Sequence, residues 1–287
     1  MRTVLVHLEL SPALESVLAC ALHVGRAFGS HLEGLHVRPG QPDIIAAGAD
    51  GFVAAAPDLV AGFEREARER AERARALFDE FTRRHELPGA AAAGEAAVSG
   101  PTAGWRAETG SADALLGGLG RVFDLILVGR PLPDAVAPSM AALETALFEA
   151  GRPLLIAPPR VPERLGERVA IAWNGSTETA RAVAFSMPFL ERAREVTVIG
   201  IQGGTVPGPP AAELARNLRR HGLPVTLREA PLSGRSIGQA MLDEANAAGA
   251  DLVVKGAYTQ SRLRQMIFGG ATSHFLARAE LPVLMAN

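Results

Sequence analysis

The residues best suited to chemistry lie near the end of the chain, in the segment GAYTQSRLRQMIFGGATSHF at 256–275. A glycine after the apolar run LVVKG lets the backbone turn sharply, and the pair Gly269 and Gly270 lets amide N–H groups approach an anion. The positive end of a helix favours phosphate at such a place. Arg262 and Arg264 could reach phosphate oxygens, although solvated surface charge is the simpler interpretation for at least one of them.

Other catalytic patterns are missing from the sequence. The Walker pattern GxxxxGK[ST] is absent, and nothing near His274 in sequence orients it as an acid or base. CxxC and Cys/His patterns are also absent. The single cysteine, Cys20, lies among apolar residues of a helical pattern, where buried packing is more common than a reactive thiol. We therefore expect neither catalytic residues nor a metal site.

The candidate phosphate-binding segment at 256–275 belongs to the second copy of an internal repeat. Residues 3–37 and 168–201 each read as strand, turn, amphipathic helix and strand, and FDLILVGRP from Phe123 matches ADLVVKGAY from Ala250. Continuous apolar strands such as LILVG and LVVKG indicate parallel strands buried on both faces. The sequence thus predicts two tandem α/β domains, each a doubly wound five-stranded parallel sheet.

The expected elements follow from these patterns. Strands are expected at 4–8, 32–37, 104–108, 125–129, 154–157, 169–173, 195–201, 225–229, 252–256 and 283–286. Helices are expected at 13–28, 58–85, 112–121, 139–149, 177–192, 211–221, 236–248 and 271–278, the second of them highly charged and solvated. The N-terminal domain would occupy 1–157 and the C-terminal domain 168–287, with a proline-rich linker at 158–167.

The two halves together resemble the universal stress protein family, whose nucleotide-binding members carry G-x2-G-x9-G-[ST] after the fourth strand. Gly256 matches the first glycine and Gly269 the third. Thr259 stands in place of the second glycine, and Gly270 stands where Ser or Thr would be, with Thr272 two residues further on. The resemblance implies an adenine nucleotide alpha hydrolase-like fold and an ATP site, with Mg²⁺, in the second half.

The resemblance also implies contacts to the base and ribose. The family commonly has an aspartate after the first strand, and Asn174 matches it, with an acceptor but no charge. Backbone around Gly200 and Ile201 would line the base pocket. Apart from the resemblance, the sequence NGS predicts a turn, with Ser176 or Thr177 as the helix cap.

The matching loop of the first half lacks these features. It contains three prolines, which have no N–H for a phosphate, and no glycine between 129 and 151. Glu9 takes the place of Asn174 and would repel phosphate. We expect the first half to bind no nucleotide.

Composition limits the partners. The 29 basic residues against 31 acidic ones leave no net field that would attract nucleic acid or an anionic membrane. No run reaches the roughly 20 apolar residues of a spanning helix, and the N-terminus reads as a strand and a turn rather than a signal peptide. We expect a cytoplasmic protein.

Two functions are compatible with these observations. The first is an ATP-binding stress-response protein with no hydrolysis or very slow hydrolysis; the alternative is a nucleotide-free dimerisation or interaction module of the same fold. In either, we expect two separate sheets related by a pseudo-twofold axis. The strands 154–157 and 283–286 should lie side by side as an intramolecular pseudo-dimer. A homodimer of the whole chain stays open.

Overall fold

The computed structural model describes residues 1–40, 57–89, 100–132, 137–257 and 270–287. Thr259, Gly269, Arg262 and Arg264 lie outside these ranges. The first half contains β1 (Thr3–His7), α1 (Leu14–Phe28), β2 (His31–Arg38), α3 (Pro57–Arg84), β3 (Thr102–Thr109), α5 (Ala112–Leu119), the 3-10 turn η2 (Gly120–Val122), β4 (Leu125–Gly129), α6 (Met140–Glu149) and β5 (Leu154–Ala157).

The second half repeats this order. It contains β6 (Arg168–Trp173), α7 (Thr177–Leu190), β7 (Glu195–Ile201), α8 (Ala211–Arg220), β8 (Val225–Ala230), α9 (Ile237–Ala247), β9 (Leu252–Gly256), α11 (Ala271–Arg278) and β10 (Val283–Ala286). β4, β5, β7, β9, β10 and α11 have the predicted bounds. α5 ends earlier than predicted and passes into η2, because the sequence GGLG is a poor helix former.

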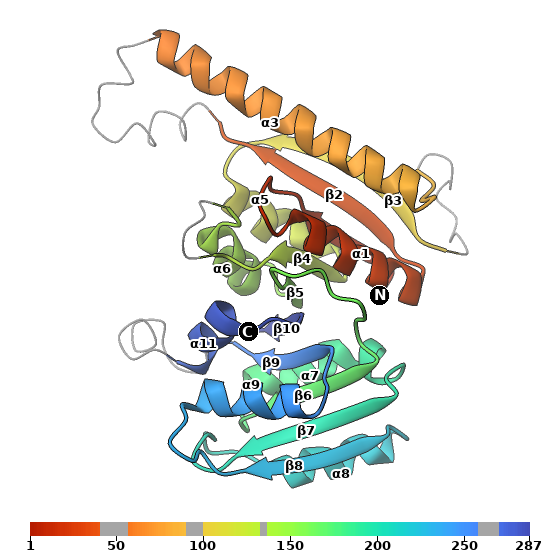
Figure 1. The fold of residues 1–287 in the computed structure, drawn as a ribbon, viewed down its shortest axis with the longest axis vertical. Coiled ribbons are helices and arrows are strands. Elements are labelled where there is room, and N and C mark those ends of the chain that lie inside the picture. Colours follow the sequence, from red (N-terminus) through yellow and green to blue (C-terminus); the bar gives the residue numbers. More distant parts are fainter. Residues whose placement is uncertain (41–56, 90–99, 133–136, 258–269) are drawn as a thin grey trace.

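The strands form one ten-stranded sheet in the order β3-β2-β1-β4-β5-β10-β9-β6-β7-β8 (Figure 1). Each half has the same parallel order, and β5 and β10 join the halves as an antiparallel pair. Leu155 pairs with Leu284, its own counterpart in the repeat, so a local twofold axis passes through this pair. The predicted neighbourhood of the two last strands is confirmed.

The expectation of two separate sheets was wrong. An unpaired β5 or β10 would expose a row of backbone N–H and C=O groups, and pairing the two satisfies both edges at once. The halves are therefore repeats in sequence and topology but share a single sheet. Since this pairing uses both strands, a homodimer of the whole chain would need another surface.

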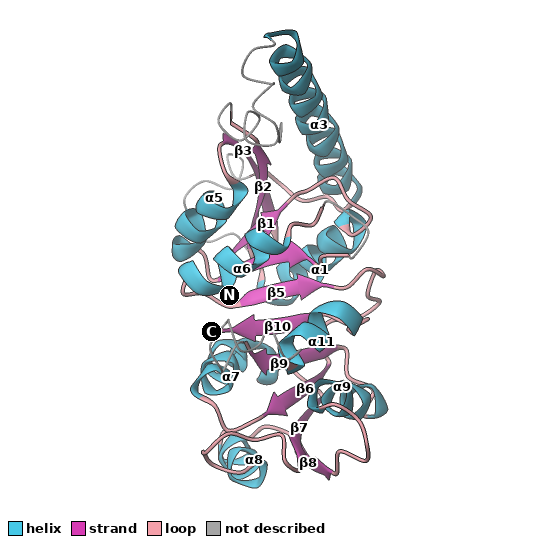
Figure 2. Cartoon of the chain, turned by 90° about the vertical axis from the view of Figure 1, so that its left-hand side faces the viewer, coloured by secondary structure: helices cyan, strands magenta, loops and turns pink. Residues whose placement is uncertain are grey.

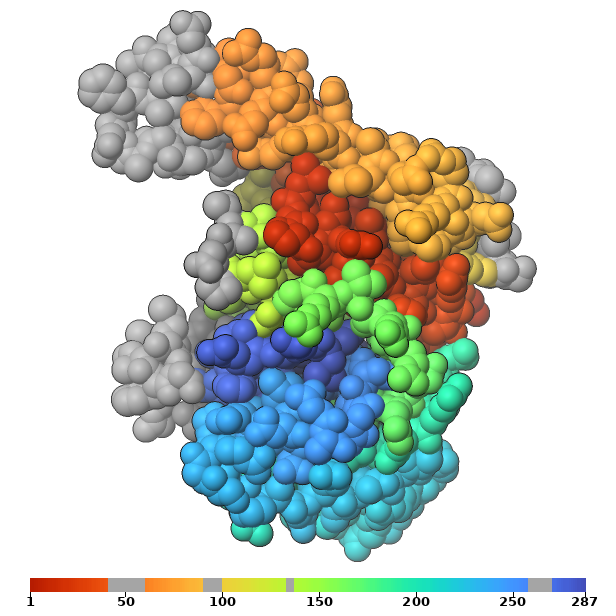
Figure 3. Space-filling model, viewed as in Figure 1, coloured from red at the N-terminus to blue at the C-terminus, as the bar shows by residue number. Residues whose placement is uncertain are grey.

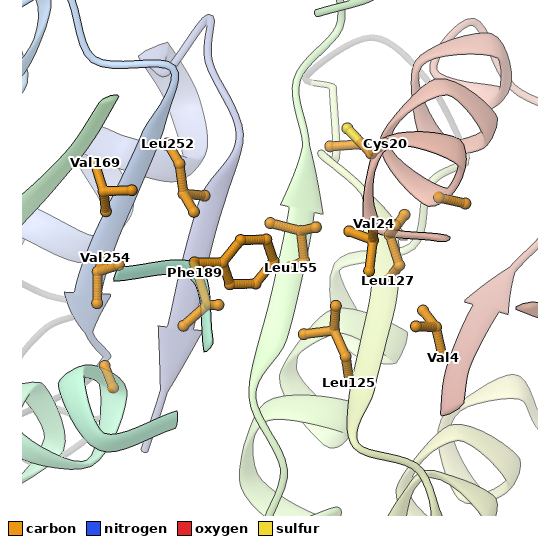
Figure 4. Close-up of a cluster of buried hydrophobic side chains, with 14 of the residues drawn as sticks. Val4, Cys20, Val24, Leu125, Leu127, Leu155, Val169, Phe189, Leu252 and Val254 are labelled. Atoms are coloured by element: carbon orange, nitrogen blue, oxygen red, sulfur yellow. The ribbon is translucent and has the colours of Figure 1, made fainter. Parts of the chain in front are cut away.

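Helices cover both faces of the sheet (Figure 2). One hydrophobic cluster lies under α1, α3, α7 and α8, and a second lies under α5, α6, α9 and α11. Each cluster runs through both halves. Figure 4 shows Leu155 and Phe189, one from each half, in the first cluster, where the rings of Phe28 and Phe189 also meet edge to face at 4.9 Å. Cys20 is buried there as predicted, and burial raises the pKa of its thiol to about 12.

The largest difference between the halves is α3, which lies along the outside of β2 and β3 (Figure 1). In the space-filling view it is the orange ridge at one end of the molecule (Figure 3). As predicted, it is mainly a solvated helix, with exposed i,i+4 ion pairs such as Arg75 to Asp79 at 2.8 Å. Its few buried side chains, Ala67, Ala74, Phe78 and Phe81, form the stripe that packs on the sheet. In the part of the chain that the structure describes, no helix is both long and apolar enough to cross a membrane.

Candidate nucleotide site

The carboxyl ends of β9, β6 and β7 form the edge at which ligands of doubly wound sheets bind. Trp173 pairs with Gly200, and Ala172 pairs with Lys255. The residues that follow, Asn174, Ile201 and Gly256, therefore lie along the same edge. The sheet brings together the sequence-predicted positions from these three strands.

Asn174 begins the turn between β6 and α7. Its Oδ1 accepts hydrogen bonds from Ser176 N at 3.1 Å and Thr179 Oγ1 at 2.6 Å. Ser176 is the helix cap, since its Oγ accepts from Thr179 N at 3.2 Å. The capping prediction is thus confirmed for Ser176, and the Asn174 oxygen is committed to the turn.

Gly256 ends β9 directly beside the first turn of α7. A Cβ at this position would lie 2.4 Å from the backbone nitrogen of Thr179 and 2.6 Å from its Oγ1. Backbone cannot give way as a flexible side chain can, so only glycine fits. The glycine is required by strand–helix packing whether or not a ligand is present.

The segment after β7 folds back over the Asn174 turn. Val206 N donates to Asn174 O at 2.9 Å, and the Trp173 indole donates to Pro209 O at 2.9 Å. Ile201 has its side chain in the core, 2% exposed, and its carbonyl accepts from Gly204 N at 2.9 Å. Its side chain therefore serves packing, and its backbone lies at the edge.

Gly270 and Thr272 begin α11. Gly270 is the N-cap, in an extended conformation, and it brings no side-chain acceptor to the first turn. The Thr272 side chain is buried, and its Oγ1 accepts a hydrogen bond from Lys255 Nζ at 2.9 Å. Among the predicted residues that the structure describes, these two mark the helix end where an anion would lie.

Lys255 is the site residue that the sequence analysis missed. It is 6% exposed, and its ammonium donates to Gly256 O at 2.7 Å as well as to Thr272. Burial lowers the pKa of the amine to about 7. A signal was present in the sequence, because Lys255 is the single lysine among 29 basic residues and it stands within an apolar strand.

The corresponding edge of the first half is built differently. Glu9 Oε2 accepts a hydrogen bond from Ser139 N, at the N-terminus of α6, at 3.3 Å. Burial raises the pKa of the Glu9 carboxyl, and the bond from Ser139 opposes that rise. His7 lies 3.5 Å from Glu9 and is buried, which lowers the pKa of its imidazole to about 4. The place of Lys255 is taken by Val128.

Histidines and carboxylates of the described ranges form pairs, such as His7 with Glu9, rather than larger clusters. No group of three or more His, Cys, Asp or Glu residues there could hold a metal ion. Burial and then the charge of Arg278 lower the pKa of His274. No hydrogen bond joins its ring to another described side chain, so it has no orienting partner there.

Comparisons with known proteins support this architecture. Residues 166–287 match the family model described as "Universal stress protein family". Over 99% of this chain and 96% of the other, the fold is similar to a universal stress protein from Archaeoglobus fulgidus DSM 4304, with a TM-score of 0.68 and 16% identity. A putative universal stress protein from Pseudomonas aeruginosa UCBPP-PA14 gives 0.53 and 15% identity, over 100% and 93% of the two chains. No curated protein matches the sequence.

The fold defines the class first: a tandem pair of α/β units that share one sheet. The second half, residues 166–287, matches the universal stress protein family model, so the likeness in sequence to that family lies in this half. At 15 to 16% identity, the solved structures extend the likeness in fold to the first half.

Proposed function

We propose that the second half binds an adenine nucleotide, ATP with Mg²⁺, and that the protein acts in stress response or signalling in the cytoplasm. The observation that supports this is the convergence of the β6 turn, the end of β9 and the start of α11 at one sheet edge. The proposed contact residues are Asn174, Ile201, Gly256, Thr259, Gly269, Gly270 and Thr272.

The residues present fit a phosphate better than they fit a ribose. The start of α11 offers a helix N-terminus, a Thr272 hydroxyl and a buried amine below it. Asn174 has one carboxamide oxygen, and the turn uses it, whereas an aspartate would have a second oxygen. ATP, when bound, supplies a polyphosphate and a purine for recognition. We propose binding without efficient hydrolysis.

A matched pair of variants tests this proposal. Thr272→Val removes a hydroxyl at nearly constant shape, and Ser139→Ala removes the cap hydroxyl of the matching helix in the first half. A ligand at a hundred times its dissociation constant stabilises the folded state by about 2.7 kcal/mol, which a melting curve detects. We expect ATP and Mg²⁺ to raise the Tm of wild type and Ser139→Ala, and to raise that of Thr272→Val much less.

The contradicting outcome is also clear. If millimolar ATP leaves the wild-type Tm unchanged, and mass spectrometry of the denatured protein finds no released nucleotide, the second half is not a nucleotide site. If Ser139→Ala alone loses the response, the nucleotide lies in the first half.

One observation favours the alternative, a nucleotide-free interaction module. Gly256 is explained by its contact with Thr179, and Gly175 by its φ of +83° and by the carbonyl oxygen of Val206, which would lie 3.2 Å from a Cβ at position 175, with no ligand required. A module of this kind would give no nucleotide-dependent Tm shift and would purify without nucleotide. The experiment above separates the two functions.

A further inference from the structure

Lys255 carries a titratable amine in an apolar place. Its strand, β9, pairs with β6 on one side and β10 on the other, so no sheet edge gives the side chain access to water. The described chain offers its ammonium two acceptors, Gly256 O and Thr272 Oγ1, and the ring of Phe275 at 5.7 Å. The side chain lies on the same face of the sheet as α11.

The surroundings of the Lys255 amine contain no described counter-charge. Within the described ranges, no carboxylate forms an ion pair with Lys255, and burial alone accounts for its lowered pKa. The amine also lies at the first turn of α11, whose dipole is positive there. A buried cation beside a positive helix end is costly unless an anion joins it.

The first half shows what an anion does at the equivalent helix end. There the Glu9 carboxylate reaches Ser139 N at the start of α6, and Val128 lies where the amine would be. In the second half, the corresponding oxygen of Asn174 is held by Ser176 and Thr179. The chain thus places its own carboxylate at one helix end and a buried amine at the other.

We propose that Lys255, together with the Thr272 hydroxyl and the first turn of α11, binds a phosphoryl oxyanion and takes up a proton from solvent as it does so. The inference rests on the proposed function, for which it names the residue that balances the phosphate charge. No covalent step is involved: the amine gains a proton, and the resulting ammonium donates to a phosphate oxygen.

Lysine suits this role, whereas arginine does not. A guanidinium keeps its proton at every accessible pH, but a buried amine can lose its proton and regain it when an anion arrives. A chain that uses arginine at every other basic position buries its only lysine at this helix end.

The pH dependence can be assigned to Lys255 above neutral pH. The charged and titratable groups on the packed elements are Arg168 of β6, Glu178 and Arg181 of α7, Asp243 and Glu244 of α9, and His274 and Arg278 of α11. Carboxyl and guanidinium groups ordinarily do not titrate between pH 7.5 and 9.5. The pKa of His274 is lowered, and the last ionisation of the terminal phosphate of ATP lies at roughly pH 6, so with ATP both are complete below this window. Tripolyphosphate itself loses a proton within the window, so its pH dependence is read as the difference between wild type and Lys255→Arg.

The experiment follows the single lysine directly. Protein labelled at lysine Cε is titrated from pH 6 to 10 by NMR, alone and with saturating tripolyphosphate or ATP and Mg²⁺. We expect either probe to raise the Lys255 titration midpoint by about one pH unit or more, because the bound anion stabilises the ammonium. At pH 8 the binding enthalpy measured by calorimetry should depend on the ionisation enthalpy of the buffer, which reveals the uptake of a proton.

Variants give an independent measurement. By calorimetry, Lys255→Met should weaken tripolyphosphate binding about tenfold to a hundredfold, the range for losing one charge-assisted hydrogen bond. Lys255→Arg should bind ATP and Mg²⁺ without the pH dependence that wild type shows between 7.5 and 9.5. Val128→Met places the same side chain at the matching position of the first half and should leave binding unchanged.

The outcomes separate this inference from the proposed function. If ATP binds while the Lys255 signal does not move and Lys255→Met binds equally well, the inference is wrong and the function stands. If tripolyphosphate binds through Lys255 and ATP does not, the oxyanion site stands and the nucleotide function is wrong. If neither probe binds, both are wrong.

Discussion

At the carboxyl edge of the sheet, the two halves place different groups at the N-terminus of the last helix. In the first half, Glu9 supplies a carboxylate to the N-terminus of α6 and a neutral His7 lies behind it. In the second half, Asn174 turns toward α7 and Lys255 lies under α11. The N-terminus of α6 has a carboxylate from its own chain, whereas the N-terminus of α11 has an amine beside it. The same topology thus yields a closed edge and an edge suited to an anion.

The largest expected effect concerns the glycines that end β4 and β9. A Cβ at Gly256 would lie 2.4 Å from the Thr179 backbone, whereas a Cβ at Gly129 would lie 2.6 Å from the ring of Pro138. Gly256→Ala should therefore cost roughly 3 kcal/mol of unfolding free energy and Gly129→Ala about 1 to 2 kcal/mol. Urea denaturation of both variants checks this order, and a larger loss for Gly129→Ala would contradict it.

The next effect comes from the buried amine. The folded pKa of Lys255, about 7, lies below its unfolded value of 10.5, so the unfolded state binds more protons between these values. The wild type should thus gain stability relative to Lys255→Met as pH rises from 7 to 9, by about 2 kcal/mol. Denaturation at pH 7, 8 and 9 measures the difference. A difference that does not change with pH would mean that the amine titrates normally.

A smaller effect distinguishes the first half in acid. The folded pKa of His7, about 4, lies below its usual 6.5, so its contribution to stability is lost as pH falls through this window. Glu9 has a raised pKa and opposes this loss. Position 7 of the first half corresponds to Ala172 of the second. We expect His7→Ala to lose less unfolding free energy than wild type between pH 6.5 and 5, by about 1 kcal/mol. Parallel curves for the two proteins would refute this.

The smallest effect concerns the helix caps that both halves share. Ser139 Oγ accepts from Ala142 N, and Ser176 Oγ accepts from Thr179 N. Ser139→Ala and Ser176→Ala should each lower stability by about 0.5 to 1 kcal/mol. Thermal melts would show whether the two caps are equivalent. A much larger loss at Ser176 would indicate that its contact with Thr179 Oγ1 also matters.

The sequence predicted the repeat well because apolar strands buried on both faces leave a strong signal. The bounds of LVVKG and LILVG were right for that reason. The site was harder to predict, since side-chain partners in the folded chain are not visible in spacing. The commitment of Asn174 to Thr179 depends on how closely β9 approaches α7, and the role of Lys255 depends on where α11 begins. The strand patterns predicted that the last strands of the two halves lie side by side. They did not predict that this pairing joins the two sheets into one.

The antiparallel pairing of β5 with β10 has a consequence for how the two edges can differ. In a dimer of identical subunits, one sequence specifies both edges, so every substitution appears twice. Here one chain carries both partners, and each edge can vary alone. Dilution cannot separate the partners either, because their association is intramolecular and does not depend on protein concentration. The first half can therefore keep Glu9 and Val128 as structural residues while the second keeps Asn174 and Lys255.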